Sequence, residues 1–86
     1  MEVVDRKKTG SYHTLISFLN FAHQKLLQAE VASPRLDAEI LMAENLNISR
    51  AELMTYPGRL LTCVEADNFF SKIERRVLRE PVSHIT

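Results

Sequence analysis

Four side chains in this sequence could act as metal ligands or as a nucleophile: His13, His23, Cys63 and His84. They lie far apart and show neither the HxxxH nor the CxxC spacing that brings metal ligands together. Cys63 is expected in the first turn of a helix, a position that can activate a thiol, but no base accompanies it. We therefore expect no metal site and interpret Cys63 as a structural cysteine.

The glycines and carboxylates do not indicate catalysis either. Gly10 and Gly58 stand alone, so the sequence contains neither a P-loop nor a GxGxxG loop. Asp37 and Glu39 are two residues apart on an expected helix, and roughly 200° therefore separates their directions. This argues against a paired-carboxylate acid–base site. We expect no catalytic residue and no cofactor-binding residue in this chain.

One group of charged residues stands out, which we refer to as the basic stripe: Lys72, Arg75, Arg76 and Arg79. Their spacings of 3, 1 and 3 place them on one face of a helix, away from its apolar residues. The stripe is either a solvated helix face or a docking site for an acidic partner or RNA phosphates, which Arg binds in bidentate fashion. Arg35 completes the candidate docking residues.

Helices are expected to position these residues, because only two Gly and three Pro interrupt the chain. Ser11 is expected to cap a first helix that ends near Ala29. A second helix is expected to begin at Pro34, with the Ser33 hydroxyl accepting a backbone N–H, and to end within 45–47. Neighbouring helices joined by short connections are expected to be antiparallel.

Two capping boxes, Ser49–Glu52 and Thr62–Glu65, open the remaining helices. The first box begins a short helix that Pro57-Gly58 ends, and the second begins a helix that reaches about Arg79. Apolar residues at helical spacing predict the core faces: Leu15, Phe18, Leu19, Ala22 and Leu26, then Leu36, Ile40, Leu41 and Ala43, then Ala66, Phe69, Phe70, Ile73 and Val77. The fold class is therefore an all-α bundle of four to five helices.

Two segments fall outside the helical domain expected at 11–80. Residues 1–10 carry five charges, and we interpret them as a flexible N-terminal tail. Residues 82–86 alternate apolar and polar side chains, which favours an extended segment. Nothing else in the sequence could pair with it as a sheet, so the pattern predicts a strand whose partner lies elsewhere.

Composition indicates the class of protein. The chain has 86 residues, of which 45% are hydrophobic and 26% charged, as is typical of one small folded domain. Eleven basic and eleven acidic residues cancel, which argues against direct nucleic-acid binding and against anionic membranes. The single cysteine, with no signal peptide and no long apolar run, predicts a cytoplasmic location without membrane association. We expect a monomer.

An ordered series of motifs covers residues 12–86: 33–41, 46–53, Tyr56-Pro57, Arg75-Arg76, 79–82 and 84–86. This series resembles the N-terminal domain of HemK/PrmC-type methyltransferases, which modify peptide-chain release factors. The resemblance implies that a β-hairpin linker, starting at 81–86, leads to a Rossmann-like domain. In the family that domain binds S-adenosylmethionine and methylates the glutamine of the GGQ motif in class I release factors.

The family's methyl-donor loop and NPPY motif are absent from this sequence, so no catalytic or cofactor residue carries over. S-adenosylmethionine is implied only for the missing domain. The resemblance favours a non-catalytic domain that recognises the release factor and positions it. The alternatives are a nucleic-acid-binding helical module and a purely structural domain. Arg35, Asp37 and Glu39 are expected to fix their helix within the bundle more than to dock a partner.

Overall fold

The computed structural model describes residues 14–85, and over this range the protein is all-α, as predicted. Five helices follow one another: α2 (Leu15–Gln28), α3 (Pro34–Leu46), α4 (Arg50–Thr55), α5 (Cys63–Val77) and α6 (Val82–Ile85). The predicted tail at 1–10 and the predicted cap Ser11 lie outside the described residues.

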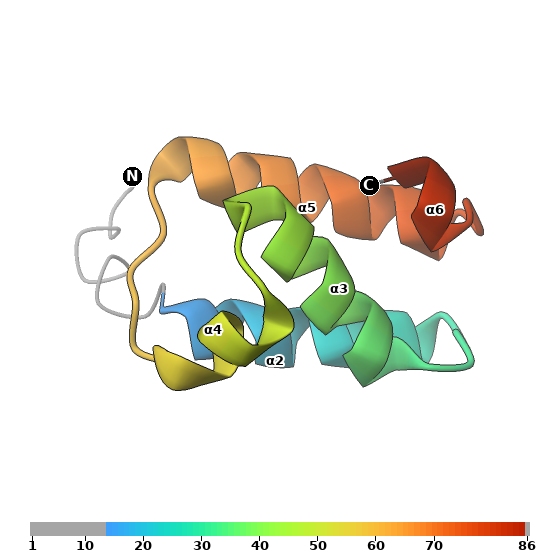
Figure 1. Cartoon of the computed structure of the whole chain (residues 1–86). Coiled ribbons are helices and arrows are strands. Elements are labelled where there is room, and N and C mark those ends of the chain that lie inside the picture. Colours follow the sequence, from blue (N-terminus) through green and yellow to red (C-terminus); the bar gives the residue numbers. More distant parts are fainter. Residues whose placement is uncertain (1–13, 86) are drawn as a thin grey trace, which may run out of the picture.

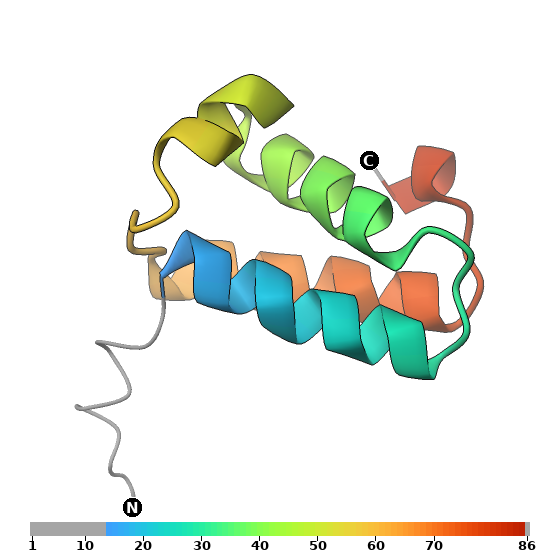
Figure 2. The same cartoon turned by 90° about the horizontal axis from the view of Figure 1, so that it is seen from below.

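Three helices form the body of the molecule. Helices α2 and α5 run side by side in the same direction, and α3 crosses both in the opposite direction (Figures 1 and 2). Helix α4 and the loop after it lie where α2 and α5 begin, and α6 lies where they end (Figure 1). The short α2–α3 connection gives the expected antiparallel pair, whereas the longer path from α3 to α5 allows α5 to run parallel to α2.

The core lies between these three helices. Its fully buried large side chains are Phe69, Leu15, Leu19, Leu26, Leu41, Met42, Leu53 and Ile73. Burial of each such side chain stabilises the fold by about 1.5–3 kcal/mol. The apolar face of α2 contacts both α3 and α5.

Two apolar residues predicted for the core are exposed, and a third, Ile40 of α3, is only half-buried and lies outside the core cluster. Leu36 is 42% exposed and Phe70 is 37% exposed. On α3, Asp37 and Ala38 are buried next to Leu36. The prediction was wrong at Leu36 because it counted only apolar residues, while the buried side of α3 includes a carboxylate that has an ion-pair partner.

Most helix starts agree with the sequence. Both capping boxes form, with Ser49 and Thr62 accepting from the backbone N–H of Glu52 and Glu65. Ser33 is the N-cap of α3 as predicted, but its hydroxyl makes no capping hydrogen bond. Its ψ of 68° differs from the ψ values near 160° of the other caps, and this backbone does not direct the hydroxyl to the helix.

Helix α2 is capped by Thr14 instead of Ser11. The Thr14 hydroxyl accepts from the backbone N–H of Ser17 at 3.3 Å. The backbone N–H of Leu15 donates to the carbonyl of Arg59 at 2.7 Å, and the next N–H donates to the Pro57 carbonyl at 2.9 Å. The loop after α4 therefore satisfies the start of α2, a contact that local sequence cannot reveal.

The segment after Pro81 is one helical turn, so the predicted strand is wrong for Val82–Ile85. The backbone N–H of His84 donates to the Pro81 carbonyl at 2.9 Å, and Ile85 is buried in the core. Val82 and Ile85 are three residues apart, so one helical turn places both against the bundle. The alternating polarity of these few residues favours an extended strand only weakly, whereas burial of Ile85 stabilises the helical turn.

Candidate docking surfaces

Arg76 of the basic stripe points into the bundle. Its Nε donates to Oδ2 of Asp37 on α3 at 2.9 Å, and its Nη1 donates to the Glu80 carbonyl at 3.2 Å. Asp37 is 8% exposed and is the one buried charged residue in the described part of the chain. Removing either partner from such a pair would leave a poorly solvated charge. Arg76 therefore joins α5 to α3.

Arg75 and Arg79 hold the C-terminal end of α5. Arg75 pairs with Glu80 and donates from Nη2 to the His84 carbonyl of α6 at 3.1 Å. Arg79 reaches the C-terminus of α2, where its Nη2 donates to the Ala29 carbonyl at 2.7 Å. Because α2 and α5 are parallel, the negative ends of their dipoles lie together, and Arg79 places a positive charge between them.

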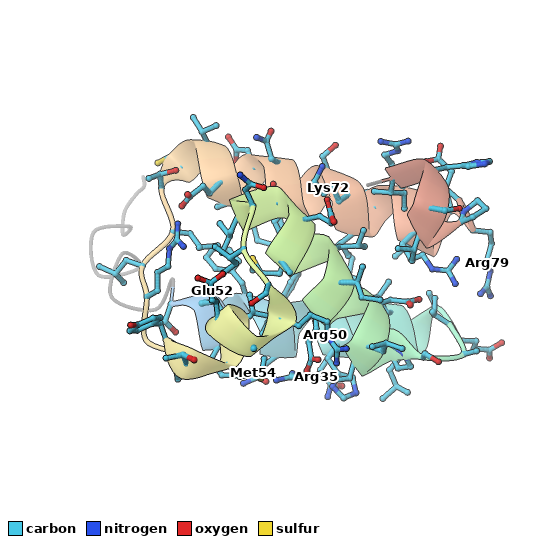
Figure 3. All side chains as sticks on the ribbon, viewed as in Figure 1. Arg35, Arg50, Glu52, Met54, Lys72 and Arg79 are labelled. Atoms are coloured by element: carbon cyan, nitrogen blue, oxygen red, sulfur yellow. The ribbon has the colours of Figure 1, made fainter. Side chains whose placement is uncertain are left out.

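Arg35 belongs to a second ionic group. Its Nε donates to Glu39 at 3.2 Å, and its Nη1 donates to Oδ1 of Asn20 on α2 at 3.0 Å. Glu39 also accepts from Arg50 of α4 at 2.9 Å, and Figure 3 shows Arg35 and Arg50 close together. This group ties α2, α3 and α4 together. With the Asp37 pair, it confirms that these charged residues of α3 fix the helix in the bundle.

Lys72 differs from the arginines of the stripe. It is half-buried and makes no ion pair or hydrogen bond within the described part of the chain. Figure 3 places it along α5, apart from Arg79 at the end of that helix. The stripe therefore shares one helix but does not form one free surface. We refer to Arg75, Arg76, Arg79, α6 and the C-terminus of α2 as the braced end.

Apolar side chains are exposed on the other part of the α2–α5 pair, from the starts of the two helices to their middles. Phe21 of α2 is 50% exposed, and Phe70 of α5 is 37% exposed. Leu60 and Val64, which flank the start of α5, are more exposed still. Scattered apolar residues are ordinary on a protein surface, but a group of them marks a candidate interaction site. We refer to these four residues and the groove beside them as the open end.

A groove of about 430 Å³ lies between α2 and α5 at the open end. The Phe70 ring meets the Phe18 and Phe21 rings edge-on, with centroids 5.2 Å and 5.5 Å apart. A volume of this size is typical of sites that accept a small ligand or a few side chains. The groove is lined by Ser17, Phe18, Phe21, Leu61, Thr62, Cys63, Ala66, Asp67 and Phe70.

The sequence reasoning missed this groove because it assigned Phe69 and Phe70 to the same core face. Adjacent helical residues point roughly 100° apart. Phe69 is buried, while Phe70 turns to the side of the α2–α5 pair that lines the groove. The signal that could have revealed the groove is the pair of adjacent phenylalanines on α5 together with the wide apolar face of α2.

The structure brings no candidate set of metal ligands together within residues 14–85. No three His, Cys, Asp or Glu side chains in this range converge on a point that could hold a metal ion. His13 lies outside the described residues. Cys63, interpreted from the sequence as a structural cysteine, is exposed at the start of α5 and lines the groove.

None of the helices within 14–85 is long and apolar enough to cross a membrane. No solved structure matches the chain. Residues 17–86 match the sequence model of the PrmC N-terminal domain.

Two curated relatives carry the name release factor glutamine methyltransferase. The protein from Koribacter versatilis is 42% identical over 85% of this chain and 26% of its own length. The protein from Nitratidesulfovibrio vulgaris is 36% identical over 87% of this chain and 25% of its own length. The chain thus spans about a quarter of the length of these relatives. Because the family model matches residues 17–86, which make up most of the chain, the chain belongs to the PrmC N-terminal domain family.

Proposed function

We propose that this chain is the substrate-holding domain of a release factor glutamine methyltransferase. In this role it binds a class I peptide chain release factor, while another part of the full enzyme methylates the glutamine of the GGQ motif. The observation that carries the proposal is the family match over residues 17–86, together with the name that the relatives carry. The setting is the cytoplasm, where translation ends.

The chain itself takes no part in the chemistry under this proposal. The methyl donor, S-adenosylmethionine, needs a glycine-rich loop or a comparable cradle. Between residues 14 and 85 the one glycine is Gly58, which lies in the turn after α4 with open space around it. The described residues do not fit the cofactor, and we assign it to the remaining three quarters of the full enzyme.

Holding the substrate can accelerate the methyl transfer without any catalytic group. A bound release factor has lost most of its translational and rotational freedom, so its glutamine meets the active site at a high effective concentration. Such a domain must be rigid between its docking surface and its junction with the rest of the enzyme. The contacts of Arg75 and Arg79 to α6 and α2 supply rigidity of this kind.

The predicted docking residues contribute unequally to the proposal. Arg35, Arg75, Arg76 and Arg79 are engaged within the bundle, so any contact they make with a partner is additional to a structural role. Lys72 keeps its charge available, and we propose it as a peripheral contact to an acidic partner residue. Exposed charge pairs of this kind chiefly affect the association rate.

The test is an NMR titration of the ¹⁵N-labelled chain with a class I release factor, and with S-adenosylmethionine as control. We expect selective shifts with the release factor, a Kd on the order of 10–100 μM as for small interfaces, and no shifts with the cofactor. Absence of any shift at the highest soluble release factor concentration would refute substrate holding. A steep loss of affinity with added salt, together with binding to an unrelated RNA, would support the nucleic-acid alternative instead.

A further inference from the structure

The groove at the open end carries one charged side chain, that of Asp67. Its carboxylate has no ion pair and no hydrogen bond among residues 14–85. The neighbouring carboxylate of Glu65 is already occupied, because it pairs with Arg59 at 3.0 Å and accepts from the backbone N–H of Thr62. Asp67 is therefore the uncompensated charge of the groove.

The two helix starts beside the groove offer no competing site for an anion. At α5, Thr62 and Glu65 form a closed capping box. At α2, the Thr14 side chain and the carbonyls of Pro57 and Arg59 accept from the first backbone N–H groups. The polar character of the groove rim is thus set by a carboxylate, which attracts a cation.

One aromatic residue of the groove wall, Phe21, already has a cation beside its ring, from a lysine that does not itself line the groove. The ammonium group of Lys25 lies 5.9 Å from the centroid of the Phe21 ring, within the range of a cation–π contact. Phe21 and Phe70 also leave apolar surface open to an incoming side chain. A ligand that combines an apolar group with a positive charge matches both features.

We propose that the groove between α2 and α5 receives an apolar side chain of the release factor that neighbours a lysine or arginine. The apolar side chain packs against Phe18, Phe21 and Phe70, and the cation pairs with Asp67. The assignment rests on the proposed function, because it names the surface through which the substrate is held. It makes the open end, and not the basic stripe, the principal contact.

The first experiment reverses the charge of Asp67 and measures release factor binding by calorimetry. Asp67→Lys should weaken binding by about tenfold, as expected for a charge contact inside an interface. Glu44→Lys is the matched control: Glu44 is exposed on α3, lies outside the groove and has no ion-pair partner among the described residues. It changes the net charge equally and should leave Kd within about twofold.

The second experiment tests the apolar wall. Phe70→Ser and Phe21→Ser should each weaken binding by about tenfold or more, because aromatic anchors dominate interfaces. Leu78→Ser is the control, since Leu78 is 78% exposed and lies just after α5 at the braced end. Phe21 is the more exposed phenylalanine, so Phe21→Ser keeps the test valid if Phe70→Ser loses stability.

The outcomes separate this inference from the proposed function. Unchanged affinity in Asp67→Lys and Phe21→Ser, with shifts of bound protein confined to Arg35 or Lys72, would overturn the groove assignment and leave substrate holding intact. If the NMR signals of groove residues shifted with the concentration of the chain alone, the occupant would be a second copy of the chain. If the NMR signals of groove residues shifted on deletion of residues 1–13 in the absence of release factor, the occupant would be that segment. Either result would overturn the inference, and no binding at all would refute both proposals.

Discussion

The two ends of the bundle use the same pair of parallel helices in opposite ways. At the braced end, where α2 and α5 finish, three arginines donate to carboxylates and carbonyls of four segments, which are α3, α6, the end of α2 and the turn after α5. At the open end, the first backbone N–H groups of both helices have acceptors, and the aromatic side chains of Phe21 and Phe70, near the middles of the helices, remain partly exposed. At the braced end the charged side chains are engaged in contacts within the fold. At the open end apolar side chains remain exposed to solvent.

This difference reverses the simplest interpretation of the sequence. A cluster of arginines suggests a surface for an acidic partner, while phenylalanines at helical spacing suggest core. In the folded chain, the negative ends of the parallel α2 and α5 dipoles lie close together, and positively charged side chains there stabilise both helix ends. The α3 helix covers only one side of the α2–α5 pair, so aromatic residues on the other side face the groove. Spacing along one helix does not reveal which neighbour covers it.

The largest effect should follow from breaking the buried pair of the braced end. Asp37→Ala leaves the partly buried Arg76 guanidinium without its carboxylate, and we expect a loss of about 3 kcal/mol of unfolding free energy. Urea denaturation followed by circular dichroism measures this. Arg50→Ala is the control, because the Arg50 side chain is 53% exposed in its pair with Glu39 and should contribute less. Equal losses in the two variants would contradict a special role of the Asp37–Arg76 pair.

A somewhat smaller loss should follow from truncating the core contact of α6. Ile85 is 5% exposed, so Ile85→Ala should lower the free energy of unfolding by about 2 kcal/mol. The same urea titration checks it, with Val64→Ala on the open end as the exposed control. If Ile85→Ala behaved like the control, α6 would not belong to the braced end.

Arg79 allows backbone and side-chain effects to be separated. Its φ of 76° is left-handed, a conformation that costs roughly 1 kcal/mol for any residue other than glycine. Arg79→Ala should therefore lose about 1 kcal/mol from its hydrogen bonds to the end of α2. Arg79→Gly should lose less, because glycine regains about 1 kcal/mol of backbone strain. Thermal unfolding of the two variants provides the comparison, and equal melting temperatures would argue against this account of the turn.

The smallest effect on stability is expected at the open end. Phe21→Ser removes a side chain that is half in solvent, so the free energy of unfolding should change by less than about 1 kcal/mol. The same substitution should weaken release factor binding strongly. A large loss of stability with unchanged binding would reverse the roles assigned to the two ends.

Local sequence predicted the fold class and most helix boundaries because those signals act within one turn. The boxes Ser49–Glu52 and Thr62–Glu65 and the proline at the start of α3 need only neighbouring residues. The start of α2 depends on carbonyls of Pro57 and Arg59, far away in the sequence. The helical turn at Val82–Ile85 depends on burial of Ile85, which a four-residue pattern cannot report.

The candidate site was less predictable than the fold for the same reason. The basic stripe is real as a helical face, but the destinations of Arg76 and Arg79 lie on α3 and at the end of α2. The Phe70 position needed knowledge of which side of α5 is covered. Asp67 carried no signal in the sequence at all, because its importance comes from the absence of a partner among the neighbouring described residues.

The most direct test of the central claim uses Cys63, the single cysteine of the chain, which is exposed and lines the groove. The rate of its alkylation is followed by the mass of the chain, with and without a class I release factor. At about 90% saturation the account predicts roughly tenfold slower alkylation of Cys63, because only unbound chain reacts. A Ser83→Cys, Cys63→Ser variant, which places the thiol on α6, should react at an unchanged rate. Full reactivity of Cys63 in the bound state, with protection at position 83 instead, would show that the braced end meets the substrate and would contradict the account.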